Sequence, residues 1–104
     1  MRDLPKNIQI LNISVNMGRI GGWVAQADYQ EKIPLIERFF HQTDTYLSDL
    51  QSEKVSEKFK STLNNFKKEY KNLRKQQING KNRLLWAEKA LTWANILQHR
   101  AELA

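Results

Sequence analysis

Hydrophobic side chains recur at intervals of three and four residues over much of the chain, and this spacing constrains the fold more than any other feature. The clearest stripe, in the third quarter, consists of Val55, Phe59, Leu63, Phe66, Tyr70 and Leu73. Residues three and four apart share one side of an α-helix, so the stripe predicts an amphipathic helix. Ser52 is the expected N-cap. Asn79-Gly80 is the expected stop, because both residues tolerate the left-handed conformation that ends many helices.

The second quarter repeats this pattern. Its stripe consists of Tyr29, Ile33, Ile36, Phe40, Thr43, Leu47 and Leu50. Asp28 and Glu31 have the spacing of a capping box, which would start the helix at Asp28. Pro34 would then lie past the first turn and kink the helix. The alternatives are a helix that begins near Ile33 and a helix that bends there.

The first quarter is the most ambiguous segment. One helical stripe consists of Ile10, Ile13, Met17, Ile20 and Val24, and a second consists of Ile8, Leu11, Val15, Gly18 and Gly22. Residues 8–17 also alternate in places as a strand does, and isoleucine and valine favour strands. We predict a helix here, because a lone strand would have no partner in an otherwise helical chain.

The last quarter predicts a helix from Asn82, as N-cap, towards the C-terminus. Its broad face consists of Leu84, Ala87, Leu91, Ala94, Leu97 and Ala101, and a second strip consists of Leu85, Ile96 and Leu103. One helix packed on one core does not need two strips. We therefore expect an oligomer or partner interface formed by Leu85, Trp86, Trp93, Ile96 and Leu103. The two tryptophans either pack in the core or a dimer interface, or stack on bases beside Lys89 and Arg100.

These patterns together predict an all-α protein. We expect a single domain over residues 1–104, folded as a small bundle of three to four antiparallel helices with short connections. The first and last helices carry apolar residues on two sides. A second copy of the chain is the simplest partner that could bury the second apolar side, so we predict a homo-oligomer, with a dimer as the simplest form.

Charge is concentrated in the second half of the chain, which has a net charge of +6 overall. Residues 1–52 carry five basic and six acidic side chains, whereas residues 53–104 carry twelve basic and five acidic ones. On a helical projection four of the basic residues fall within a sector about 60° wide. With Lys75 beside them, they form a candidate face for nucleic acid or an acidic partner: Lys60, Lys67, Lys71 and Arg74. The alternative is a solvated helix face that keeps the protein soluble.

The sequence contains no pattern that indicates an enzyme. It has no cysteine, its two histidines are far apart, and no serine lies in a Gly-x-Ser-x-Gly turn. Gly18-Arg19-Ile20-Gly21-Gly22 lacks the lysine and hydroxyl of a phosphate-binding loop, so we interpret it as a close helix crossing or a hinge. No apolar run is long enough for a membrane span, and the charged N-terminus does not resemble a signal peptide. We expect a cytoplasmic protein without a cofactor.

Two segments resemble known families. Residues 86–89 and 91–101 resemble the ends of small uncharacterised helical proteins of cyanobacteria, which implies a cytoplasmic protein and supplies no activity. Gly18–Val24 is similar to a segment of the accessory variability proteins of diversity-generating retroelements, which are basic bundles that oligomerise and bind a reverse transcriptase and nucleic acid. That segment ends the chain in the family but lies near the start here, so no site is transferred.

The sequence therefore supports two hypotheses of different classes. The first is a non-enzymatic interaction or assembly module, a homo-oligomeric helical bundle that binds a protein partner. The alternative is a basic nucleic-acid-binding accessory protein that uses the face around Lys60, Lys67, Lys71 and Arg74. Neither hypothesis identifies the biological process.

Overall fold

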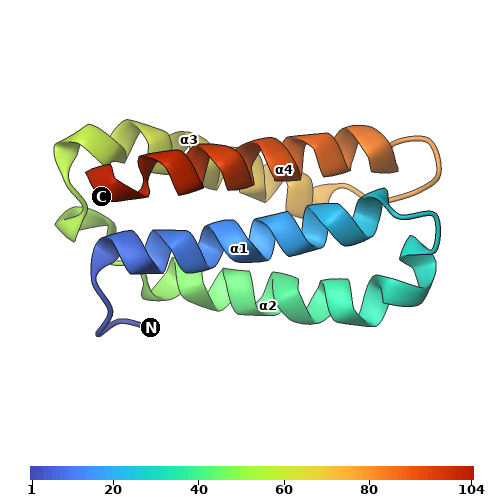
Figure 1. Ribbon diagram of the computed structural model, residues 1–104, viewed down its shortest axis with the longest axis horizontal. Helices are drawn as coiled ribbons and strands as arrows, with labels where there is room; N and C mark the ends of the chain where they lie inside the picture. The colour runs from blue at the N-terminus through green and yellow to red at the C-terminus, as the bar shows by residue number, and fades with distance from the viewer.

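The chain folds as an elongated four-helix bundle, described here for residues 1–104 by a computed structural model. The helices are α1 (Lys6–Ala25), α2 (Ile33–Asp49), α3 (Glu57–Lys75) and α4 (Arg83–Arg100). Short 3-10 turns cover Tyr29–Lys32, Ser52–Lys54 and Ala101–Leu103. Each helix runs antiparallel to the one before it, and both chain ends lie at the same end of the bundle (Figure 1). The prediction of a small all-α bundle is confirmed, and residues 8–17 are helical rather than extended.

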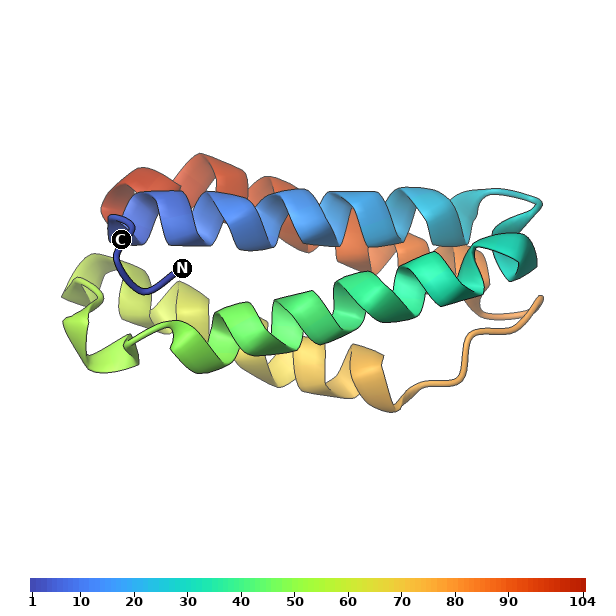
Figure 2. The ribbon, with the colours of Figure 1, turned by 90° about the horizontal axis from the view of Figure 1, so that it is seen from below.

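The four helices form a ring in which α1 contacts α2 and α4, while α3 contacts α4. Side-chain bonds from Tyr70 and Arg74 join α3 to α2. Figure 2 shows α1 and α2 side by side from below, with α4 and α3 behind them. In this ring α3 lies diagonally opposite α1, so the most basic helix is the one furthest from the first helix.

The start of α2 resolves the alternatives around Pro34. Residues Tyr29–Lys32 form a 3-10 turn, α2 begins at Ile33, and Pro34 lies in its first turn. Proline is tolerated there because the first N–H groups of a helix have no intrahelical partner. Asp28 makes no side-chain capping bond, so the capping box predicted there does not form.

Both predicted ends of α3 are wrong. The helix begins at Glu57, preceded by Ser56, while Ser52 belongs to a separate 3-10 turn. Ser56 donates its backbone N–H to the Ala104 carbonyl and its hydroxyl to the Leu103 carbonyl. At the other end the chain becomes extended at Gln76, and no residue has a positive φ angle. Asn79 does not stop α3; its side-chain oxygen accepts the N–H groups of Lys81 and Asn82 at the start of α4.

The core lies along the bundle axis and is filled mainly by the predicted stripes, although Ile33 of the second stripe and Leu84 and Leu91 of the predicted α4 face are exposed. The first-helix stripe from Ile10 to Val24 is buried, as is the α3 stripe from Phe59 to Leu73. Trp86 lies among these residues at 1% exposure, with its ring edge-on to Phe40. Its indole N–H donates to the Leu73 carbonyl at 3.0 Å. This bond satisfies the one polar atom of a side chain that otherwise fills the centre of the bundle.

The glycine cluster brings α1 and α4 together, as one of its two interpretations predicts. A Cβ atom placed on Gly21 would lie 2.9 Å from Leu91 Cγ and 3.3 Å from the Ala87 carbonyl oxygen. At Gly18 the nearest atom would be Ala94 Cβ, at 3.8 Å. The missing side chain at Gly21 therefore sets how closely the first and last helices approach.

Candidate interaction surfaces

The outer side of α1 and α4 is a largely uncharged surface, which we call the α1–α4 face. Lys6 and Arg19 are the only charged residues in the 20 residues of α1. Val15 is 49% exposed on this side, and Ile8 is 37% exposed. Leu84 and Leu91 of α4 are also exposed. A helix that presents apolar groups to solvent opposite its core stripe is only partly covered by its own chain.

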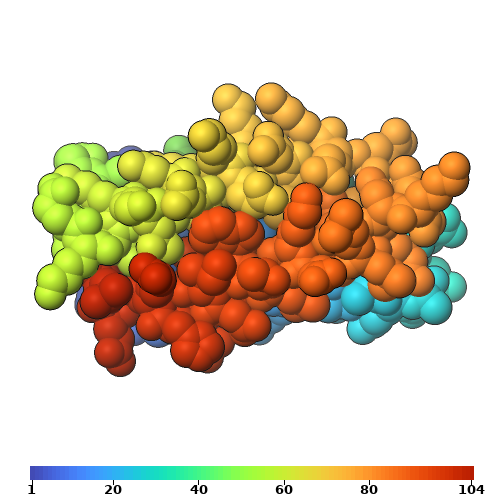
Figure 3. All heavy atoms as spheres, turned by 90° about the horizontal axis from the view of Figure 1, so that it is seen from above, coloured from blue at the N-terminus to red at the C-terminus, as the bar shows by residue number.

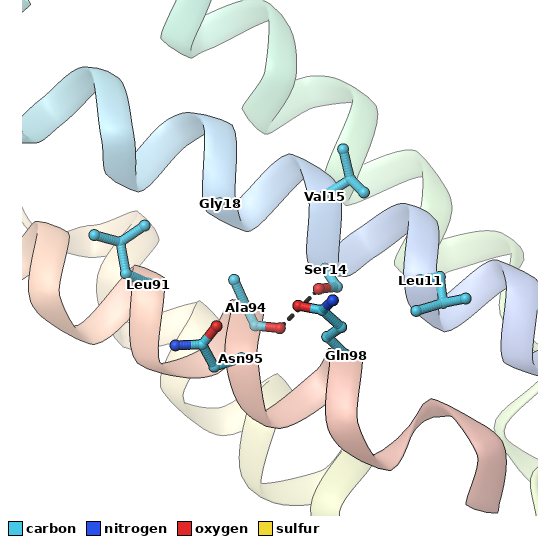
Figure 4. Close-up of a pocket in the computed structure, with 8 residues that line it drawn as sticks. All are labelled: Leu11, Ser14, Val15, Gly18, Leu91, Ala94, Asn95 and Gln98. Atoms are coloured by element: carbon cyan, nitrogen blue, oxygen red, sulfur yellow. Dashed lines mark hydrogen bonds between the residues drawn. The ribbon is translucent and has the colours of Figure 1, made fainter.

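A shallow groove of about 450 Å³ runs between these two helices (Figure 4). Its lining contains no charged side chain and consists of Leu11, Ser14, Val15, Gly18, Leu91, Ala94, Asn95 and Gln98. Ser14 closes the floor by donating its hydroxyl to the Ala94 carbonyl at 2.7 Å. The remaining surface offers apolar groups and two side-chain amides, a composition suited to packing against another helix.

The basic row predicted on α3 is largely engaged within the chain. Lys60 pairs with Glu57 at 2.8 Å, and Lys67 donates to the Ser52 hydroxyl. Arg74 pairs with Asp44 of α2 at 2.8 Å. Lys71 and Lys75 are exposed and make no ion pair. Three cations of the row are therefore engaged within the chain, and Arg74 is the one whose partner lies on α2, so the row is not a continuous line of free cations.

The contacts among Asp44, Arg74 and Tyr70 shift the pKa of all three groups. Burial raises the pKa of Asp44, but hydrogen bonds from Arg74 and Tyr70 outweigh burial and lower that pKa below its ordinary value. The hydrogen bond to Asp44 raises the pKa of Arg74, which stays charged. Burial, with the hydrogen bond to Asp44, raises the pKa of Tyr70 far above its ordinary value, so the hydroxyl remains a donor. The arrangement is a structural ion pair with a fixed proton distribution.

The predicted partner interface on α4 divides into two environments. Trp86 does not belong to it, because the whole indole is buried against residues of its own chain. Leu85 is 58% exposed, Leu103 is exposed, and Ile96 is half-buried. Trp93 is half-buried with its ring centroid 5.6 Å from that of Phe66. Periodicity separated the second strip correctly but could not place Trp86, which begins a helical face shared with Ala90 and Leu97.

The histidines and acidic residues form no metal-binding cluster. No group of three or more histidine, cysteine, aspartate or glutamate side chains is arranged to hold a metal ion. His41 and His99 are both exposed, and His99 Nδ1 contacts only the Asn95 carbonyl of its own helix. None of the helices combines the length and hydrophobicity that crossing a membrane would require.

Two features were missed at the sequence level. The groove between α1 and α4 could have been suspected from the lack of charge in residues 7–18, since a solvent-facing helix side normally carries charges. Arg83 was counted only among the excess cations, but it donates to the Ala25 carbonyl at 2.8 Å and closes the end of α1. No local signal identifies that role, because the two residues are 58 positions apart.

Comparisons with known proteins add no family. No protein-family model, no curated protein and no solved structure matches this chain.

Proposed function

We propose that this protein is a non-enzymatic assembly module that pairs with a second copy of itself through the α1–α4 face. The observation that carries the proposal is the uncharged groove between α1 and α4, flanked by the exposed Val15 side chain. Such a groove accepts an apolar ridge from a helix without leaving a buried charge unpaired. A protein partner, a dimeric state and a cytoplasmic location all remain predictions.

Charge restricts the face through which a second copy could pair. The chain carries +6, so two copies repel each other wherever their basic surfaces meet. Because α3 is diagonal to α1, pairing through α1 places the two α3 helices on opposite outer sides of the assembly. The groove of the α1–α4 face has no charged lining, and Arg19, which borders a hollow with Val15, is a cation that pairing would bring near the interface.

The geometry of α1 suits a two-fold arrangement. Val15 lies near the midpoint of the helix, which spans Lys6–Ala25. A two-fold axis beside Val15 lets the α1 helices of two copies cross, each inserting Val15 near Gly18 and Gly22 of the other. A Cβ placed on Gly22 would meet no atom within 4 Å, so space for an approaching helix exists there.

Sedimentation velocity over micromolar concentrations tests this proposal. Wild type is expected to sediment as a dimer, and Val15→Glu as a folded monomer, because the carboxylate would be desolvated in the interface. Leu85→Glu is the matched control, because Leu85 is also an exposed apolar side chain but lies on the other strip of α4. A monomeric wild type, or dissociation by Leu85→Glu and not by Val15→Glu, would refute the α1–α4 interface.

A further inference from the structure

Trp93 occupies an unusual place on the seam where α3 and α4 meet. Figure 3 views this side of the molecule, with α3 in green to yellow and α4 in orange to red. One side of the indole packs on Phe66, yet the ring also borders two separate hollows of about 260 and 340 Å³. Unlike the N–H of Trp86, that of Trp93 donates to no group of the chain. The ring is therefore held in place by the core while its edges and N–H stay accessible.

The larger hollow combines this ring with hydrogen-bonding groups. It is lined by Ser61, Thr62, Asn65, Trp93, Ile96 and Arg100. The lining contains hydroxyl, amide and guanidinium groups but no carboxylate. Arg100 reaches across the seam and donates to the Thr62 hydroxyl at 3.2 Å, which orients the guanidinium along the groove. The smaller hollow, beyond Trp93, contains Lys89 and one carboxylate, Glu88.

The cations beside the ring form no ion pairs. Lys89, Trp93 and Arg100 lie on one side of α4, because positions four and eleven residues apart differ by only about 40° and 20° in direction. Neither Lys89 nor Arg100 forms an ion pair, and the same holds for Lys68 and Lys75 on the outer face of α3. An accessible aromatic ring flanked by unpaired cations is the arrangement that single-stranded nucleic acids require.

We propose that the α3–α4 seam binds single-stranded nucleic acid without sequence preference. One base stacks against the exposed part of Trp93, with Asn65 beside its polar edge, and phosphates contact Arg100 and Lys89. The nucleic acid chain continues over the lysines on the outer face of α3. This site is separate from the α1–α4 face, so it stays open in the proposed dimer and does not depend on dimer formation.

A membrane surface fits this seam less well than a nucleic acid strand. Anionic lipids would need only the cations, and would leave the hollow around Trp93 and Asn65 without a role. A base fills that hollow with a flat ring and hydrogen-bonding edges. Vesicles rich in phosphatidylserine therefore serve as the competing probe in the experiment.

Fluorescence anisotropy with labelled oligo-dT and oligo-U, at several salt concentrations, tests the proposal. Wild type is expected to bind both, with affinity falling steeply as salt rises. Trp93→Leu should weaken binding by about fivefold to 100-fold at unchanged salt dependence, because it removes stacking but no charge. Arg100→Gln should lower the slope of log affinity against log salt by about 0.7, the value for one phosphate contact on a single strand.

Matched controls separate this site from general basicity and from misfolding. Trp23→Leu removes another half-buried tryptophan, one that packs against Phe39. Arg38→Gln removes another exposed, unpaired arginine. Both variants should bind as wild type does, and circular dichroism confirms that each variant is folded. No binding at low salt, equal effects of the site and control variants, or binding to the vesicles but not to the oligonucleotides would overturn the proposal.

Discussion

The Arg74 guanidinium lies 2.8 Å from the Asp44 carboxylate and thereby joins α3 to α2. A second contact, from Arg74 Nε to Asp44 Oδ1 at 3.3 Å, makes the pair bidentate. The Tyr70 hydroxyl donates to the same carboxylate, and the guanidinium lies over the Phe40 ring, 4.6 Å from its centroid. A residue that the sequence presents as a phosphate ligand thus holds two helices together.

Asp44→Asn should make the free energy of unfolding depend less on pH in the acid range. Because the folded pKa of Asp44 is lowered from its ordinary value of 3.8, its contribution to stability is present at neutral pH and is lost as pH falls through that lowered pKa. At pH 7 the free energy of unfolding of the variant should be lower than that of wild type by about 1 kcal/mol. The difference is this small because the carboxylate is partly exposed and solvent screens the pair. Urea unfolding between pH 2 and 7 measures the difference.

The two curves should converge towards the acid end of that range, where wild-type Asp44 is protonated. Asp28→Asn is the control, since Asp28 is exposed and makes no ion pair. A constant gap between Asp44→Asn and wild type at every pH would contradict the linkage.

Gly21→Ala and Gly22→Ala should change the free energy of unfolding in opposite directions, although the two residues are neighbours. At Gly21 the added methyl would press on Leu91 and the Ala87 carbonyl, and overpacking costs about 1–3 kcal/mol. At Gly22 the methyl meets nothing within 4 Å, so the gain in helix propensity of about 1 kcal/mol should remain. Urea unfolding at equal, low protein concentration compares them; equal stabilities would mean that α1 and α4 can separate freely.

Trp86→Ala should be far more damaging than Trp93→Ala. Removing a fully buried tryptophan typically costs about 3–5 kcal/mol, a large share of the roughly 5–15 kcal/mol of a typical domain. Trp93 is only half-buried, so its loss should cost about half as much or less. Thermal unfolding followed by circular dichroism measures both, and similar losses would contradict the different placement of the two rings.

Arg83→Ala should loosen the end of α1. The guanidinium donates to the Ala25 carbonyl at 2.8 Å and to the Val24 carbonyl at 3.3 Å, and it lies over the Tyr29 ring. A cation at a helix C-terminus contributes about 0.3–1 kcal/mol, so faster hydrogen exchange is expected in the last turn of α1. Lys81→Ala, at an exposed position, should leave that exchange unchanged.

The helices could be predicted from the sequence because their core residues recur with the helical period. Their ends could not, because contacts with distant residues decide them. Ser56 replaces Ser52 before α3 because it bonds to the carbonyls of Leu103 and Ala104, which no local pattern reveals. Likewise, α3 ends before Asn79 because that residue's side chain organises the start of α4 instead.

The candidate surfaces were predictable only in part. Sequence periodicity identifies Leu85, Ile96 and Leu103 as a strip outside the core, and the excess of lysine marks α3 as the basic helix. It does not identify which cations are engaged, since Arg74 and its partner Asp44 are 30 residues apart. It also cannot separate Trp86 from Trp93, which lie seven residues apart on nearly the same side of α4 but differ in burial.

The hydroxyl of Ser14 bonds to a carbonyl 80 residues further along the chain. During synthesis α1 therefore emerges well before α4, the helix with which it packs most extensively. Until then α1, with only two charges in 20 residues, has little to protect it from other nascent or unfolded chains. Long-range closure of this kind slows folding relative to bundles that assemble from neighbouring helices, and it leaves α1 without its main packing partner until α4 has formed.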